Sequence, residues 1–110
     1  AWAALAPAAG VVWVKSAGGG DCNAACAARG GCSEDAWPAS LEEFGPIAAQ
    51  AGQRCEATQE GGSSYDPSTD GTYCGWAGAG PENGGPALRC GETGHATTYR
   101  FCPCNDDKEL

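Results

Sequence analysis

The sequence predicts a small, disulfide-rich α+β domain: one or two short helices packed on a small antiparallel sheet, many loops and four disulfides. Its 110 residues include eight cysteines, 18 Gly and 7 Pro. Large apolar side chains are few, with four Leu, one Ile, three Val, two Phe and no Met. So few cannot form a cohesive core alone. Four disulfides at roughly 2–4 kcal/mol each would contribute as much as a whole domain's stability.

The cysteines also predict the compartment. An even number in a short chain is typical of an oxidising setting, either extracellular or in the lumen of the secretory pathway or of a plastid, including the thylakoid. Zinc binding is the alternative, but the cysteine spacing is irregular and His95 is the only histidine. We therefore expect no metal or cofactor. The expected disulfide cysteines are Cys22, Cys26, Cys32, Cys55, Cys74, Cys90, Cys102 and Cys104.

The charge balance excludes two classes of partner. The net charge is −8, and the six basic residues are scattered singly. Nucleic acids and anionic membranes both require a concentrated positive surface. We therefore expect neither as a partner, while an acidic surface alone does not identify a positive one.

Three regions are expected: an apolar N-terminal arm at 1–14, a disulfide-stapled domain at 15–104 and an acidic tail at 105–110. The arm is too short and too rich in Ala, Gly and Pro to span a bilayer. It would contact a protein partner, which could be a membrane complex to which this chain is extrinsic. Alternatively, Val11, Val12 and Val14 form a first strand of the domain's own sheet. The candidate partner-binding residues are Trp2, Leu5, Val12 and Trp13.

Two helical segments follow. Asp21 can cap a helix that Gly30-Gly31 terminates, which predicts a helix over 21–31. Ser40 and Glu43 form a capping box that starts a second segment ending at Gly52. Because Gly45-Pro46 interrupts it, the prediction there is two short turns.

Strands are expected at 72–76, 87–90 and 97–102, between loops dominated by Gly, Pro, Ser and Asp. The third run is rich in β-branched and aromatic residues and meets Pro103, which fits an edge or a strand end.

One pair of cysteine spacings is specific. Residues four apart on a helix and two apart on a strand share a face, so Cys22 and Cys26 could both bond to Cys102 and Cys104. The motifs Cys22-Asn-Ala-Ala-Cys26 and Cys102-Pro103-Cys104 locally resemble the cystine-stabilised α/β motif of defensins and scorpion toxins, where a C-x3-C helix is bridged twice to a C-x-C strand. Here 75 residues separate the two motifs, and Pro103 lies within the second.

That resemblance implies geometry only, because the membrane-directed activity of defensins requires a cationic surface. The whole chain resembles Ala/Gly-rich, eight-cysteine extracellular modules ending in R-x-C-P-C in predicted algal proteins, a resemblance that implies no function. For Cys32, Cys55, Cys74 and Cys90, three pairings remain open.

No catalytic constellation is evident. His95 lies in a turn-like sequence, Ser63 and Ser64 lack a G-x-S-x-G elbow, and no C-x-x-C occurs. Asp66 and Asp70 precede Gly71 without the alternating oxygen ligands of a calcium loop, so a β-turn is expected there. We therefore expect a non-enzymatic protein.

Three functional hypotheses remain. The first is a non-catalytic structural or docking subunit of a larger assembly, bound through the apolar arm. The second is a carbohydrate-binding extracellular module with a shallow groove flanked by Trp37 and Tyr65, its possible ligand-stacking side chains. The third is a secreted inhibitor with rigid loops. Trp76 and Tyr99 are expected in the core.

Overall fold

The computed structural model describes residues 11–60, 63–77 and 88–106. The predictions for Trp2, Leu5 and the rest of 1–10, for residue 87 and for residues 107–110 lie outside the described residues. The described part is a disulfide-rich α+β fold, as predicted: a five-stranded sheet carries two short α-helices and one 3₁₀ turn.

The strands follow the order β1-β5-β3-β4-β2 across the sheet. Neighbouring strands run antiparallel, except for β2 and β4, which are parallel. Strand β3 lies between β2 and β4 in the chain and is antiparallel to β4. The prediction of an antiparallel sheet therefore holds for three of the four strand pairings. The strands span β1 Val12–Lys15, β2 Thr58–Glu60, β3 Ser68–Thr69, β4 Cys74–Trp76 and β5 Tyr99–Cys104.

Strand β1 confirms the alternative interpretation of the arm's last residues, which form a strand of the domain's own sheet. It pairs with β5 in a register that sets Trp13 opposite Pro103. The main-chain N–H of Trp13 donates instead to Oε1 of Gln50, and the Pro103 carbonyl accepts from Ser33 on the other side. Proline has no main-chain N–H, but at Pro103 the sheet loses no hydrogen bond to β1. Strand β5 therefore continues through the proline to Cys104.

The first predicted helix is divided in two. Helix α1 spans Cys22–Ala25 and the 3₁₀ turn η2 spans Ala27–Arg29. As predicted, the carboxylate of Asp21 caps the start by accepting from the Ala24 N–H at 2.8 Å. Gly30 ends the segment at φ 78°, in the left-handed conformation that glycine adopts without strain.

The prediction of two short turns after Ser40 is wrong. A single helix, α2, spans Leu41–Gln50 with Pro46 inside it. Its N-terminus has the predicted cap: Ser40 Oγ accepts from the Glu43 N–H at 3.2 Å, and Glu43 Oε1 accepts from the Ala39 N–H at 2.8 Å. Pro46 is only the sixth residue, so its ring removes one bond near the start, and burial of Phe44, Ile47 and Ala48 offsets that loss.

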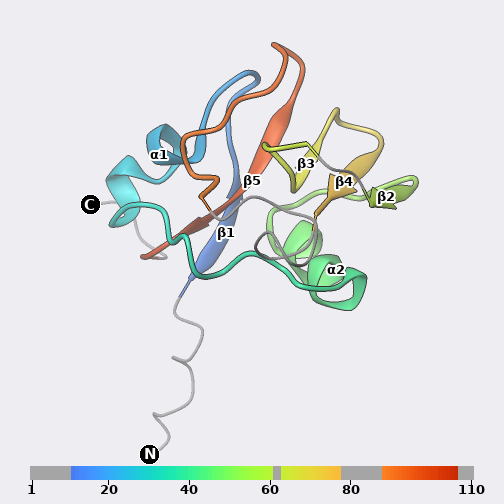
Figure 1. Ribbon diagram of the computed structural model, residues 1–110, viewed down its shortest axis with the longest axis horizontal. Helices are drawn as coiled ribbons and strands as arrows, with labels where there is room; N and C mark the ends of the chain where they lie inside the picture. The colour runs from blue at the N-terminus through green and yellow to red at the C-terminus, as the bar shows by residue number, and fades with distance from the viewer. Residues whose placement is uncertain (1–10, 61–62, 78–87, 107–110) are drawn as a thin grey trace, which may run out of the picture.

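Four disulfides link the elements. Cys22–Cys102 and Cys26–Cys104 join α1 and its C-cap to β5, as the spacing allows, with Cα–Cα distances of 5.2 and 5.0 Å. The structure resolves the pairing of the remaining four as Cys32–Cys90 and Cys55–Cys74. Helix α1 contacts β5 and α2 contacts β1, so the two helices cover different parts of the sheet (Figure 1).

The core combines cystines with aromatic rings. Trp13 packs edge-on against Trp37 with centroids 6.1 Å apart, and Phe44 against Phe101 at 5.5 Å. Trp76 is buried, as expected. The expectation for Tyr99 is wrong: it is 37% exposed because it begins β5 at the rim of the sheet.

The strand predicted at 87–90 is absent over the described residues 88–90. The main-chain N–H groups of Arg89 and Cys90 donate to the carboxylate of Glu34, at 2.8 and 3.1 Å. The Cys90 carbonyl accepts from the first turn of α1. These backbone groups are therefore satisfied without a neighbouring strand.

Candidate binding cleft

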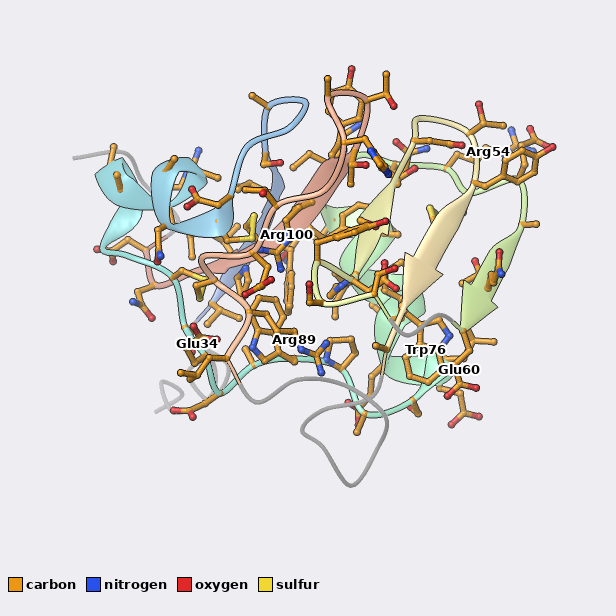
Figure 2. All side chains as sticks on the ribbon, turned by 45° about the horizontal axis from the view of Figure 1, so that its top comes forward. Glu34, Arg54, Glu60, Trp76, Arg89 and Arg100 are labelled. Carbon is orange, nitrogen blue, oxygen red and sulfur yellow. A yellow bond between two sulfur atoms is a disulfide. The ribbon has the colours of Figure 1, made fainter. Side chains whose placement is uncertain are left out.

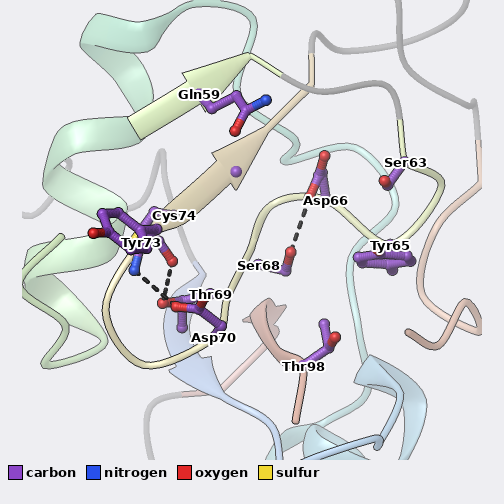
Figure 3. A pocket seen from close by; sticks show the side chains of 11 residues that line it. Gln59, Ser63, Tyr65, Asp66, Ser68, Thr69, Asp70, Tyr73, Cys74 and Thr98 are labelled. Atoms are coloured by element: carbon purple, nitrogen blue, oxygen red, sulfur yellow. Dashed lines mark hydrogen bonds between the residues drawn. The ribbon is translucent and has the colours of Figure 1, made fainter. Parts of the chain in front are cut away.

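An open cleft of about 300 Å³ lies over β3 and β4. Its walls come from β2, the loop at 63–66, the β3–β4 turn and Thr98, which precedes β5 (Figure 3). Segments distant in the sequence thus meet there because β3 pairs with both β4 and β5.

Two tyrosine rings flank this cleft. Figure 3 shows Tyr65 and Tyr73 on opposite sides of it, with Asp66 and Ser68 between them. Tyr73 is 57% exposed, whereas Tyr65 is half-buried. The cleft thus has Tyr65 and Tyr73 at its sides, and the predicted pairing of Tyr65 with Trp37 is wrong, because Trp37 does not line it.

Asp66 provides the buried polar group of the cleft. It is only 4% exposed, and its Oδ1 accepts from Ser68 Oγ at 2.8 Å. Burial raises the pKa of this carboxyl above 3.8, although hydrogen bonds from Ser68 and the Ser63 main chain and the charges of Arg89 and Arg100 oppose that rise. An ionised carboxylate has about four acceptor positions, so Asp66 retains capacity for a ligand.

The β3–β4 turn holds Tyr73 in place. Asp70 Oδ1 accepts from the N–H groups of Thr72 and Tyr73, both at 2.8 Å, and these bonds lower the pKa of Asp70. The Thr69 hydroxyl donates to the Tyr73 carbonyl at 2.7 Å and accepts from Gly71, whose φ is 102°. The turn is thus fixed by its own side chains, which hold the main chain of Tyr73 beside the cleft.

Two fully buried arginines support the cleft from inside the domain (Figure 2). Arg100 Nε donates to the Tyr65 carbonyl at 2.9 Å, and Arg89 Nη1 donates to the carbonyls of Asp66 and Ala77 at 3.3 and 3.4 Å. Burial lowers the pKa of Arg100 to about 10, so it remains charged at neutral pH. The main chain of Tyr65–Asp66 is therefore anchored by charged donors.

Trp37 lies in the core, against the expectation of a freer surface side chain. It is 6% exposed, and the guanidinium carbons of Arg89 and Arg100 lie 5.3 and 5.7 Å from its ring centroid. Its indole N–H donates to Glu34 Oε1 at 3.1 Å. Cation–π contacts of this kind stabilise buried guanidinium groups. The sequence reasoning missed both arginines, although each adjoins a core residue, Cys90 or Phe101.

The predicted partner-binding residues inside the described part of the chain are Val12 and Trp13, both in β1. Val12 is half-buried and Trp13 is buried. Beside them lies an apolar hollow of about 230 Å³ lined by Val11, Trp13, Pro46, Ile47 and Gln50.

Comparison with protein-family models, curated proteins and solved structures found no significant match. In the described residues, no group of three or more His, Cys, Asp or Glu side chains is arranged to hold a metal ion. Likewise, none of the helices described here has the length and apolarity to cross a bilayer.

Proposed function

We propose that this chain is a non-catalytic carbohydrate-binding module of an oxidising, extracellular setting. The observation that carries the proposal is the pair Tyr65 and Tyr73 flanking an open polar cleft with a buried carboxylate, Asp66, between them. The four disulfides indicate an oxidising compartment.

The chemistry of the cleft fits a sugar. Aromatic rings offer flat apolar faces to the C–H faces of a pyranose, and carboxylates and hydroxyls exchange hydrogen bonds with its hydroxyl groups. The volume, about 300 Å³, is at the lower end of the range for ligand sites, which suits one or two sugar units.

The hydrogen bonding supports binding rather than hydrolysis. Most glycoside hydrolases need two carboxyl groups, one as a proton donor and one as a nucleophile or base. Among the residues that the structure describes, the carboxylates lining this cleft are Asp66 and Asp70, and Asp70 Oδ1 already accepts two main-chain N–H groups of its own turn. Asp70 therefore serves the structure of the turn.

A glycan array and calorimetry test the proposal. Tyr65→Ala and Tyr73→Ala should each weaken binding of any captured glycan about tenfold, the loss typical of an aromatic contact residue. Tyr99→Ala is the matched control, because Tyr99 is also partly exposed but does not line the cleft. A blank array with folded, fully oxidised protein would overturn the proposal.

The docking hypothesis stays a prediction. It depends mainly on residues 1–10, which lie outside the described residues, and on Val12 and Trp13, which belong to β1. Deleting 1–10 should release a bound partner without unfolding the domain, and retained partner binding would count against it. The inhibitor hypothesis has no additional support from the described loops.

A further inference from the structure

The charges around the cleft restrict which glycans it can bind, an inference that rests on the proposed function. The charged side chains among the described residues that line the cleft are Asp66 and Asp70, and no Lys, Arg or His lines it. An acidic sugar would therefore meet hydrogen-bond acceptors of its own charge with no cation to pair with.

The buried arginines do not supply that missing cation. Arg100 directs its Nε to the Tyr65 carbonyl and its Nη1 to the carbonyls of Arg89 and Glu92. Both guanidinium groups lie over the Trp37 ring, with neither side chain exposed. Arg100 Nη2 has no hydrogen-bond partner in the described part of the chain but is buried, so a ligand in the cleft has no access to it.

The carboxylates around the two arginines outnumber them. Arg89 and Arg100 both favour the ionised form of Asp66, and Glu34 interacts with both arginines. Glu92 and Asp21 also interact with Arg100, so the group has no excess positive charge when Asp66 is ionised. The arginines therefore do not attract an acidic sugar to the cleft, while the Asp66 carboxylate still accepts hydrogen bonds from hydroxyl groups.

We infer that the cleft binds a neutral pyranose, held between Tyr65 and Tyr73 and donating hydroxyl hydrogen bonds to Asp66, and that it rejects acidic sugars. Specificity then comes from the absence of an accessible cation as much as from the contacts made.

Matched oligosaccharides test this inference on the wild-type protein. Calorimetry would compare neutral galactotetraose with tetragalacturonate. The neutral sugar should bind about tenfold or more tightly than the acidic one, as a misplaced charge in such a site predicts. Preference for tetragalacturonate would overturn the inference while leaving carbohydrate binding in place, whereas binding to no glycan on the array overturns the proposed function itself.

Salt dependence gives a second readout that needs no variant. Affinity for the neutral ligand should change less than about twofold between 50 and 500 mM NaCl, because screening acts only between charges. A roughly tenfold weakening would mean that ionic contacts hold the ligand, and would contradict the inference.

Asp66→Asn addresses the acceptor directly. It should weaken neutral-sugar binding about tenfold, because an amide offers one acceptor oxygen in place of two. Glu42→Gln, on the exposed face of α2, is the control and should bind as the wild type does. Unchanged affinity in a folded Asp66→Asn variant would show that Asp66 does not contact the sugar.

Discussion

Arg100 Nε donates a hydrogen bond to the main-chain carbonyl of Tyr65 at 2.9 Å, across 35 positions of sequence. This bond joins strand β5 to the loop that carries one aromatic wall of the cleft. The same guanidinium lies over the Trp37 ring. Cleft geometry and core packing therefore depend on one side chain.

Replacing Arg100 should destabilise the whole domain. Arg100→Met leaves the carbonyls of Tyr65, Arg89 and Glu92 without their donor, and a loss of about 3 kcal/mol or more in the free energy of unfolding is expected. Guanidinium titration with intact disulfides measures it. Arg100→Lys should recover only part of the loss, because an ammonium group lacks the planar set of N–H donors of a guanidinium group. The exposed Arg54→Met is the control, and an Arg100→Met loss below about 1 kcal/mol would contradict the interpretation.

The four disulfides should contribute unequally. Cys22–Cys102 spans 80 residues of sequence and Cys55–Cys74 spans 19. Because Cys26–Cys104 stays intact, the Cys22→Ala/Cys102→Ala variant opens only the ring formed by residues 22–26 and 102–104, and loop-closure entropy predicts a loss of about 2.5 kcal/mol. For Cys55→Ala/Cys74→Ala it predicts a loss of about 3 kcal/mol. Guanidinium unfolding compares the two variants. The reverse ranking would show that native-state packing around the bridges outweighs the entropy of the unfolded chain.

Asp66 should make the domain less stable as pH rises above 3.8. Burial raises its folded pKa above that ordinary value, so between the two values the native state binds more protons than the unfolded chain. The free energy of unfolding contributed by this group therefore falls as pH increases through that window and levels off above the folded pKa. Asp66→Asn removes the decline.

Urea titrations at several pH values should accordingly show that the free energy of unfolding of Asp66→Asn increases relative to that of the wild type as pH increases from 3.8. Ser68→Ala is a useful companion, because it removes the hydroxyl that stabilises the ionised form and should raise the pKa of Asp66 further. A constant difference between Asp66→Asn and wild type across the window would contradict the assignment.

The cap of α2 should be worth about 1 kcal/mol. Ser40→Ala removes the oxygen that accepts from the Glu43 N–H, and thermal unfolding should report the loss. Ser64→Ala, at an exposed position, is the control and should change stability by less than about 0.5 kcal/mol. Equal effects of the two substitutions would mean that tertiary packing alone holds the helix start.

Local chemistry in the sequence was sufficient to predict several elements. The scarcity of large apolar side chains against eight cysteines predicted a disulfide-rich fold. Asp21 and Ser40 predicted two helix starts, because a cap acts within three residues of itself. The C-x3-C and C-x-C spacings restricted two disulfides to the four cysteines that form them.

Tertiary structure decided what depends on partners distant in the chain. Pro46 stays helical because neighbouring residues of α2 are buried in the core, and Pro103 stays in its strand because its backbone faces away from β1. Trp37 becomes a core residue in contact with two arginines, and Tyr73 joins Tyr65 at the cleft. A sequence records each residue's chemistry and its near neighbours. Which arginine meets which carbonyl, and which rings share a cleft, depends on contacts that exist only once the chain has folded.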